Sequence, residues 1–184
     1  EKLQESENFE NKLFAFPAQS NVSGVKHDLS WIKKAQDLGW DVLLDAAAFV
    51  PTNQLDLKEV KPDFVCVSFY KIFGYPTGIG CLLVNKEKFK KLQKPWFAGG
   101  TVSLVSVNAI HHFLINNHER FEDGTLNYLD IPAVKIGLDY IENIGIQRIN
   151  ERVASLRKYL FENLESLQHE NGRKLIQIFG PNDH

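Results

Sequence analysis

The order of short apolar runs constrains the fold of this 184-residue chain more than any other feature. Apolar runs of strand length occur at 13–19, 40–45, 64–69 and 79–85. Between the first two runs, a stretch with helical spacing is expected to begin near Asp28 or Ser30 and to end at Gly39. Runs that are apolar throughout are typical of strands covered on both faces. The pattern therefore predicts an α/β fold with a mainly parallel central sheet flanked by helices.

The second half of the chain is expected to be mainly helical. The other candidate elements are a helix at Ser106 to Asn116, helices at 131–144 and 146–167 separated by Gly145, and a strand at 175–179. Pro132 suits the first turn of the helix at 131–144. The segment at 95–130 carries several glycines and little periodicity, which is typical of functional loops.

Composition excludes several classes of function. A net charge of -2, with acids and bases interspersed, argues against nucleic-acid and anionic-membrane partners. No run approaches the roughly 18 apolar residues of a membrane span, and the polar start is unlike a signal peptide, so a cytoplasmic protein is expected. The chain contains no methionine, even at position 1, which indicates a piece of a longer protein.

Metal, disulfide and nucleotide chemistry have little support in the sequence. Cys66 and Cys81 lie inside apolar runs and lack the spacing of a zinc site or a disulfide framework, which favours a reducing compartment. The histidines at 111, 112 and 118 are better explained as solvated polar residues than as metal ligands. The glycine-rich segment after Phe73 lacks the Gly-Lys-Ser/Thr ending of a phosphate-binding P-loop.

A lysine and an aspartate follow two of the predicted strands. Asp45 ends the run at 40–45, and Lys71 comes just after the run at 64–69. Both would lie at the carboxyl edge of a parallel sheet, where α/β proteins bind ligands. Pyridoxal phosphate requires such a pair, because its aldehyde forms a Schiff base with a lysine and its pyridine nitrogen needs an anion. Taken alone, Lys71 is better explained as a solvated loop lysine, and Asp45 as a helix cap or turn residue.

The surrounding sequence resembles the class V aminotransferase and cysteine desulfurase superfamily. The words that carry the resemblance are SFYKIFGYPTG at 68–78, FPAQSNVSG at 16–24 and FEDGT at 121–125, and they are most similar to the molybdenum cofactor sulfurases. The resemblance implies the large domain of a pyridoxal-phosphate-dependent transferase of the aspartate aminotransferase type. Residues 1–184 would form one partial domain, with the part from about 146 to 184 as a candidate link to the small domain.

The resemblance also implies a role for four residues of the two strand ends. Lys71 would hold the aldehyde and move the α-proton of the substrate, and Asp45 would pair with the pyridinium nitrogen. Ser68 would bind the phosphate, assisted by Tyr70, which stands where many desulfurases have a histidine.

Two further residues and one departure follow from the same likeness. Asn21 resembles the asparagine near the phenolic oxygen of the cofactor and the substrate. Thr101, after two glycines, resembles the residue that reaches a phosphate across a dimer interface, and the loop at 122–125 would approach the neighbouring subunit. Many desulfurases have a glutamine three residues after the aspartate, where this chain has Ala48, so one hydrogen bond to the cofactor must be absent or replaced.

For the whole protein, the resemblance implies a homodimeric enzyme that takes sulfur from L-cysteine, releases L-alanine and passes the sulfur to the molybdenum cofactor of xanthine dehydrogenase and aldehyde oxidase. The mobile thiol that carries the sulfur and the arginine that binds the substrate carboxylate are expected beyond His184. The alternatives are another pyridoxal-phosphate enzyme of class V, such as a desulfurase for other acceptors, a transaminase or a lyase, or a catalytically incomplete fragment acting as a structural or interaction module.

Overall fold

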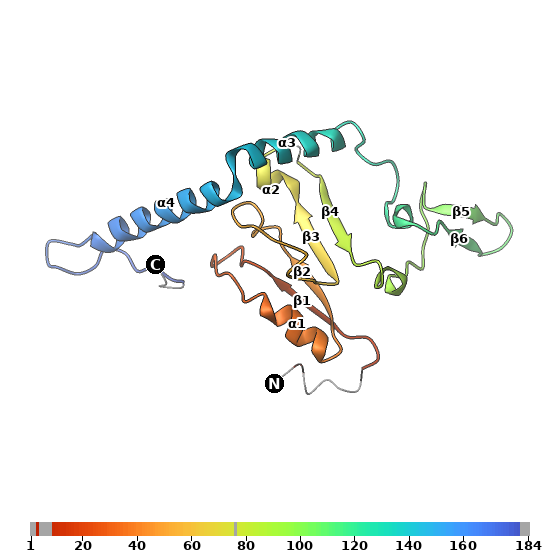
Figure 1. Cartoon of the computed structure of the whole chain (residues 1–184), viewed down its shortest axis with the longest axis horizontal. Coiled ribbons are helices and arrows are strands. Elements are labelled where there is room, and N and C mark those ends of the chain that lie inside the picture. The colour runs from red at the N-terminus through yellow and green to blue at the C-terminus, as the bar shows by residue number, and fades with distance from the viewer. Residues whose placement is uncertain (1–2, 4–8, 76, 181–184) are drawn as a thin grey trace.

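The computed structural model describes residues 3, 9–75 and 77–180, so Pro76, in the glycine-rich segment after Phe73, lies outside the described residues. The elements follow one another as β1 (Leu13–Pro17), α1 (Ser30–Asp37), β2 (Asp41–Asp45), β3 (Phe64–Ser68), α2 (Phe69–Phe73), β4 (Gly80–Val84), η1 (Phe89–Lys91), β5 (Val102–Val105), β6 (His112–Leu114), η2 (His118–Phe121), α3 (Ile131–Ile144) and α4 (Ile146–Ser166) (Figure 1).

The main sheet has the strand order β1-β2-β3-β4. β1, β2 and β3 are parallel to one another, and β4 is antiparallel to β3. The prediction of an α/β fold with a mainly parallel sheet is therefore confirmed. Figure 1 shows β5 and β6 as a separate two-stranded hairpin, on the far side of β4 from β1.

The core lies between α1 and the first two strands. The amide of Ser30 donates to the carboxylate of Asp28 at 2.8 Å, and Gly39 leaves the helix with φ of +81°. These limits place Ile32 on the sheet, where it packs with Val42 and Leu44, which are fully buried. The sequence predicted this helix because both of its end signals are local.

A charged cluster lies at the amino edge of the sheet. Asp41 accepts hydrogen bonds from Lys88 and Lys91, both at 2.6 Å. Burial acts to raise the pKa of Asp41, but the hydrogen bonds from the two lysines outweigh it and leave the pKa below its ordinary value. Asp63 is buried beside them, accepting from the amide of Val42 at 2.8 Å and pairing with Lys88 at 3.6 Å. The cluster ties β2 to the segments that flank β3 and β4.

The prediction that every apolar run is covered on both faces is wrong for β4. Leu82 and Leu83 of this strand are 50% and 43% exposed. β4 is the last strand of its sheet, and Figure 1 shows α3 crossing the upper ends of β3 and β4 instead of lying along them. The apolar composition thus predicted a strand correctly but did not reveal what covers it.

The segment from Ser106 to Asn116 is not the predicted helix. It contains the turn and the second strand of the β5–β6 hairpin, with Val105 opposite His112. The amide of Ser106 donates to the carbonyl of His111 at 3.0 Å, and the amide of Ala109 donates to the hydroxyl of Ser106 at 3.2 Å. Serine and asparagine favour such turns over helix interiors, which explains the difference.

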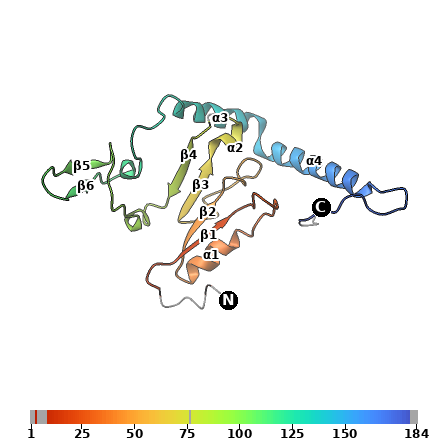
Figure 2. The same cartoon turned by 180° about the vertical axis from the view of Figure 1, so that it is seen from behind.

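The two long helices are confirmed and the last strand is not. α3 begins with Pro132 in its first turn, and Gly145, with φ of +88°, separates it from α4. The segment at 175–179 is irregular, preceded by an isolated bridge between Gln168 and Lys174. Figure 2 shows α4 extending from the sheet as an arm. Within the described ranges, no helix is both long and apolar enough to cross a membrane.

Candidate cofactor site

The carboxyl ends of the three parallel strands meet at one edge of the sheet, in the upper part of Figure 1. Each strand continues there into a different structure. β1 leads into the loop at 18–27, β2 into the turns at 46–53, and β3 directly into α2. Because β4 is antiparallel and begins with Gly80 opposite Ser68, it returns the chain from the same edge.

Asp45 lies in the middle of this edge. It is the last residue of β2, in register with Pro17 of β1 and Cys66 of β3. Its Oδ1 atom accepts a hydrogen bond from the amide of Ala47 at 3.0 Å, and the residue is exposed. Among the described residues, its Oδ2 atom has no hydrogen-bond partner. Asp45 therefore presents a carboxylate that is fixed by one oxygen and available at the other.

Ser68 ends the neighbouring strand, β3, and Tyr70 and Lys71 follow it in α2. Ser68 is the N-cap of α2, but its side chain makes no capping hydrogen bond. Lys71 is half-buried, and in the part of the chain that the structure describes its amino group forms no hydrogen bond or ion pair. Tyr70 is 42% exposed, and its hydroxyl likewise has no described partner. Three polar side chains within four consecutive residues, 68–71, thus have no described partner and are available to a ligand.

Asn21 is brought to the same edge by the loop after β1. The amide of Ser20 donates to the carbonyl of Val25 at 2.8 Å, and the hydroxyl of Ser20 accepts from the amides of Val22 and Ser23. Asn21 lies exposed within this compact loop. Its side chain makes no hydrogen bond to any described residue.

Thr101 is not brought to this edge within one chain. It immediately precedes β5, beyond β4 in Figure 1, and it is fully buried. Its hydroxyl donates to the carbonyl of Ala98 at 2.8 Å and accepts from the amide of the same residue at 3.0 Å. The amide of Gly124 donates to the carbonyl of Gly99 at 3.1 Å, so the loop at 122–125 packs on the turn that contains Thr101. Its role at a phosphate of a second subunit stays a prediction.

Sequence reasoning missed a polar network beside the site. The side chain of Asn53, in the turns after β2, donates to Gln19 at 3.3 Å and accepts from Asn150 of α4 at 3.1 Å. Asn150 also donates to the carbonyl of Thr52 at 2.8 Å. Asn53 and Asn150 lie 97 positions apart, and no local pattern marks them as partners.

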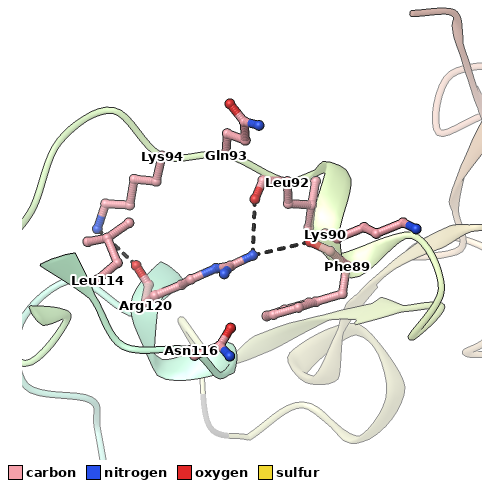
Figure 3. Close-up of a pocket in the computed structure, with 8 residues that line it drawn as sticks. All are labelled: Phe89, Lys90, Leu92, Gln93, Lys94, Leu114, Asn116 and Arg120. Atoms are coloured by element: carbon pink, nitrogen blue, oxygen red, sulfur yellow. Dashed lines mark hydrogen bonds between the residues drawn. The ribbon is translucent and has the colours of Figure 1, made fainter. Parts of the chain in front are cut away.

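Two cavities differ in their relation to this edge. A cleft of about 620 Å³ lies between the loop at 19–26 and α4, next to the asparagine network. A second cavity, of about 460 Å³, lies away from the candidate residues and is drawn in Figure 3. There the guanidinium of Arg120 donates to the carbonyls of Phe89 and Leu92 and stacks 4.4 Å from the Phe89 ring. The guanidinium of Arg120 in the second cavity is therefore already held by contacts within the protein.

The two cysteines occupy neighbouring strands and differ from a reactive thiol. Cys66 lies on β3 and Cys81 on β4, where Cys81 is opposite Val67. Burial raises the pKa of Cys66, and the charge of Asp45 raises it further. Burial also raises the pKa of Cys81, with a smaller contribution from Cys66. Both shifts oppose formation of the thiolate, the nucleophilic form.

We expect Cys66 and Cys81 to react with iodoacetamide more slowly at pH 7.5 than a free cysteine does. Because both pKa values are raised, the thiolate fraction should increase only at a higher pH than for an unperturbed thiol. Mass spectrometry of the folded protein, with the urea-unfolded protein as control, measures the two rates. Faster alkylation of Cys66 in the folded state would contradict this assignment.

Most of this chain matches one known protein family. Residues 1–176 match the family model described as aminotransferase class-V. The chain belongs to the class-V aminotransferase family.

Relatives of this class-V chain carry a more specific name. It is 44% identical over 185 residues to the molybdenum cofactor sulfurase of Bos taurus, covering 93% of this chain and 21% of that protein. It is 42% identical over 175 residues to the molybdenum cofactor sulfurase of Caenorhabditis elegans, covering 95% of this chain and 25% of that protein. The chain thus spans about a fifth to a quarter of the length of these relatives.

A solved structure supports the class-V fold. The apo structure of a cysteine desulfurase from Thermococcus onnurineus NA1 matches with a TM-score of 0.82 and 31% identity, covering 98% of this chain and 43% of that one. The predicted fold of a pyridoxal-phosphate-dependent transferase is confirmed, and so is the predicted cofactor at the level of the family.

The residues at the sheet edge fit pyridoxal phosphate. The amine of Lys71 and one oxygen of Asp45 have no described protein partner, and the hydroxyl groups of Ser68 and Tyr70 lie beside that amine in sequence. An amine, an anion and hydroxyl donors are the groups that the aldehyde, the ring nitrogen and the phosphate require. Ala48 offers no side-chain hydrogen bond in the turn after Asp45, in keeping with the departure noted in the sequence.

Proposed function

We propose that this class-V chain is the cofactor-binding part of a molybdenum cofactor sulfurase, which takes sulfur from L-cysteine and passes it to the molybdenum cofactor. One observation carries the proposal. Asp45 ends β2 and Lys71 lies just after the adjacent parallel strand β3, at the same edge, and neither the amine nor the second carboxylate oxygen is used by another described residue. The resemblance to proteins named molybdenum cofactor sulfurase supports the specific reaction.

Lys71 and Asp45 would divide the central chemistry. When bound, pyridoxal phosphate supplies a ring that can accept an electron pair from the α-carbon of an amino acid. The amine of Lys71 would hold the aldehyde between turnovers and then move the proton at the α-carbon of L-cysteine. The carboxylate of Asp45 would stabilise the protonated ring nitrogen by its charge. The hydrogen bond from the amide of Ala47 already holds this carboxylate in place, so the carboxylate would need little reorientation to take this role.

The other candidate residues would orient the cofactor. The hydroxyl groups of Ser68 and Tyr70 would donate to its phosphate, and the side chain of Asn21 would lie near its phenolic oxygen and the substrate. In a homodimer, Thr101 would reach the phosphate of the partner site. Its hydroxyl would then have to exchange its present hydrogen bonds with Ala98 for the phosphate.

The sulfur of the substrate would be transferred to a cysteine thiol other than those of Cys66 and Cys81. These cysteines lie in strands and have raised pKa values, so neither suits a mobile nucleophile. A thiolate from outside these 184 residues would attack the sulfur of L-cysteine. The carbon–sulfur bond breaks, a persulfide forms and the carbon gains a proton, so L-alanine leaves without an external oxidant or reductant.

The full-length protein that contains this chain provides the direct test. It is incubated with pyridoxal phosphate and L-cysteine, and L-alanine is quantified together with activation of a desulfo molybdenum enzyme. We expect stoichiometric L-alanine and enzyme activation, both dependent on the cofactor. D-cysteine serves as the matched substrate control, because its α-proton would face away from the lysine.

Other outcomes distinguish the alternatives. L-alanine without activation of the molybdenum enzyme would favour a cysteine desulfurase for another acceptor, the activity named for the Thermococcus relative. Pyruvate or a transamination product in place of L-alanine would identify a different reaction on the same fold. Absence of any product with a correctly folded full-length protein would favour a non-catalytic role.

A further inference from the structure

Gly137, in the interior of α3, lies directly against the helix that carries Lys71. A Cβ atom placed on Gly137 would overlap the Cγ and Cδ2 atoms of Phe73 and would lie 2.6 Å from its Cδ1 atom. Real side chains essentially never approach so closely, so the ring of Phe73 occupies the space that any other residue would fill. Phe73 is the last residue of α2, two positions after Lys71.

The helical backbone itself gives no reason for this glycine. Gly137 does not have a positive φ, and it lies well inside a helix of 14 residues, from Ile131 to Ile144. Glycine is unfavourable in a helix interior relative to alanine, because it has more conformational freedom to lose. The close approach of Phe73 is therefore the structural requirement that this glycine meets.

A second contact joins the same two segments. The hydroxyl of Tyr75, just after α2, donates to the carboxylate of Asp130 at 3.1 Å, and Asp130 is the N-cap of α3. At the start of α2, the amide of Phe69 donates to the carbonyl of Ile79, the residue before β4, at 3.2 Å. Figures 1 and 2 both show α3 lying across α2. α2 thus contacts both β4 and α3.

We propose that Gly137 is a positioning residue for Lys71. Because it has no side chain, it allows α2 to pack closely on α3 and so fixes the distance between the two helices. This inference rests on the proposed cofactor role of Lys71. A side chain at 137 would have to displace the Phe73 ring close to its attachment, because the overlapping atoms include Cγ, which has little freedom to move. α2 has only five residues, so the displacement would be transmitted to Lys71. Reacting groups tolerate misplacement of about 1 Å poorly.

The test uses Gly137→Ala in the full-length protein, with Phe73→Leu and the double variant. Two quantities are measured: hydrogen exchange of the amides at 69–75 without cofactor, and the dissociation constant of pyridoxal phosphate that becomes reducible onto Lys71. Gly137→Ala should speed exchange and weaken binding about tenfold, the usual scale for overpacking a tight contact. The double variant should recover most of both losses, because the smaller leucine makes room for the methyl group. Lys135→Ala, an exposed change on the same helix, is the matched control and should alter neither quantity.

The outcomes separate this inference from the proposed function. Normal exchange and normal binding in Gly137→Ala would overturn the positioning role, as would faster exchange with unchanged binding. Failure of the double variant to recover either quantity would also overturn it. If the wild-type protein does not attach the cofactor at Lys71, the proposed function fails and the positioning role with it. In that case, faster exchange in Gly137→Ala would still report the packing of α2 on α3.

Discussion

Borohydride reduction of the protein with pyridoxal phosphate should leave the cofactor on Lys71, and the Lys71→Ala variant should lose this attachment completely. The reason is positional: Lys71 lies in α2, which directly follows β3, the strand next to the one that Asp45 ends, and no described residue competes for its amine. Alanine removes the amine that would bind the aldehyde covalently. Peptide mapping by mass spectrometry measures the occupancy of each lysine.

Lys26→Ala is the matched control for this experiment. Lys26 is an exposed lysine in the loop after β1, at the same edge of the sheet. Its replacement should leave the labelling of Lys71 unchanged. Labelling distributed over many surface lysines, and equal in the wild type and in Lys71→Ala, would rule out a specific site at α2.

The second large effect is expected on stability, at the opposite edge of the sheet. Asp63→Ala should lower the free energy of unfolding by about 3 kcal/mol, the scale for leaving buried polar partners unsatisfied. The side chain of Asp63 is 3% exposed, and it accepts from the buried amide of Val42 and from Gln36 while pairing with Lys88. Alanine would leave the amide of Val42 without its acceptor. The midpoint of urea unfolding, followed by tryptophan fluorescence, reports the change.

Asp37→Ala provides the contrast for this prediction. Asp37 pairs with Lys33 on the solvent side of α1, with its side chain 58% exposed, and such surface pairs contribute about 0–1 kcal/mol. Cofactor labelling of Lys71 should persist in folded Asp63→Ala, because the change lies at the far end of the strands. Equal midpoints for the two variants would show that the buried cluster does not stabilise the sheet.

The sequence predicted the elements whose signals are local. The four main strands were predicted from apolar runs, α1 from Asp28 and Gly39, and the division between α3 and α4 from Gly145. Asp45 and Lys71 were assigned to one edge because parallel strands end together. In the structure Asp45 ends β2, and Lys71 lies in α2 just after the adjacent strand β3.

What the sequence did not predict depends on contacts between distant segments. The β5–β6 hairpin is defined by cross-strand pairs, and the turn from Ser106 to His111 lacks a strong glycine signal. The exposure of β4 depends on where α3 lies, and the contact of Gly137 with Phe73 depends on how α3 crosses α2. A helical glycine carries no mark that distinguishes a tolerated residue from a required one.

The antiparallel direction of β4 affects how the two halves of the site assemble. β3, α2 and β4 are consecutive in the chain from Phe64 to Val84, and β3 pairs with β4. The segment that carries Lys71 is therefore closed by residues that are near one another in sequence. Asp45 instead meets Cys66 only after the chain between β2 and β3 has closed a longer loop into parallel pairing. Local closure costs less chain entropy than distant parallel pairing and is generally faster. The segment that carries Lys71 can therefore organise during synthesis independently of the strand that carries Asp45. Binding of the cofactor, which would need both residues, would then indicate that the two segments have paired.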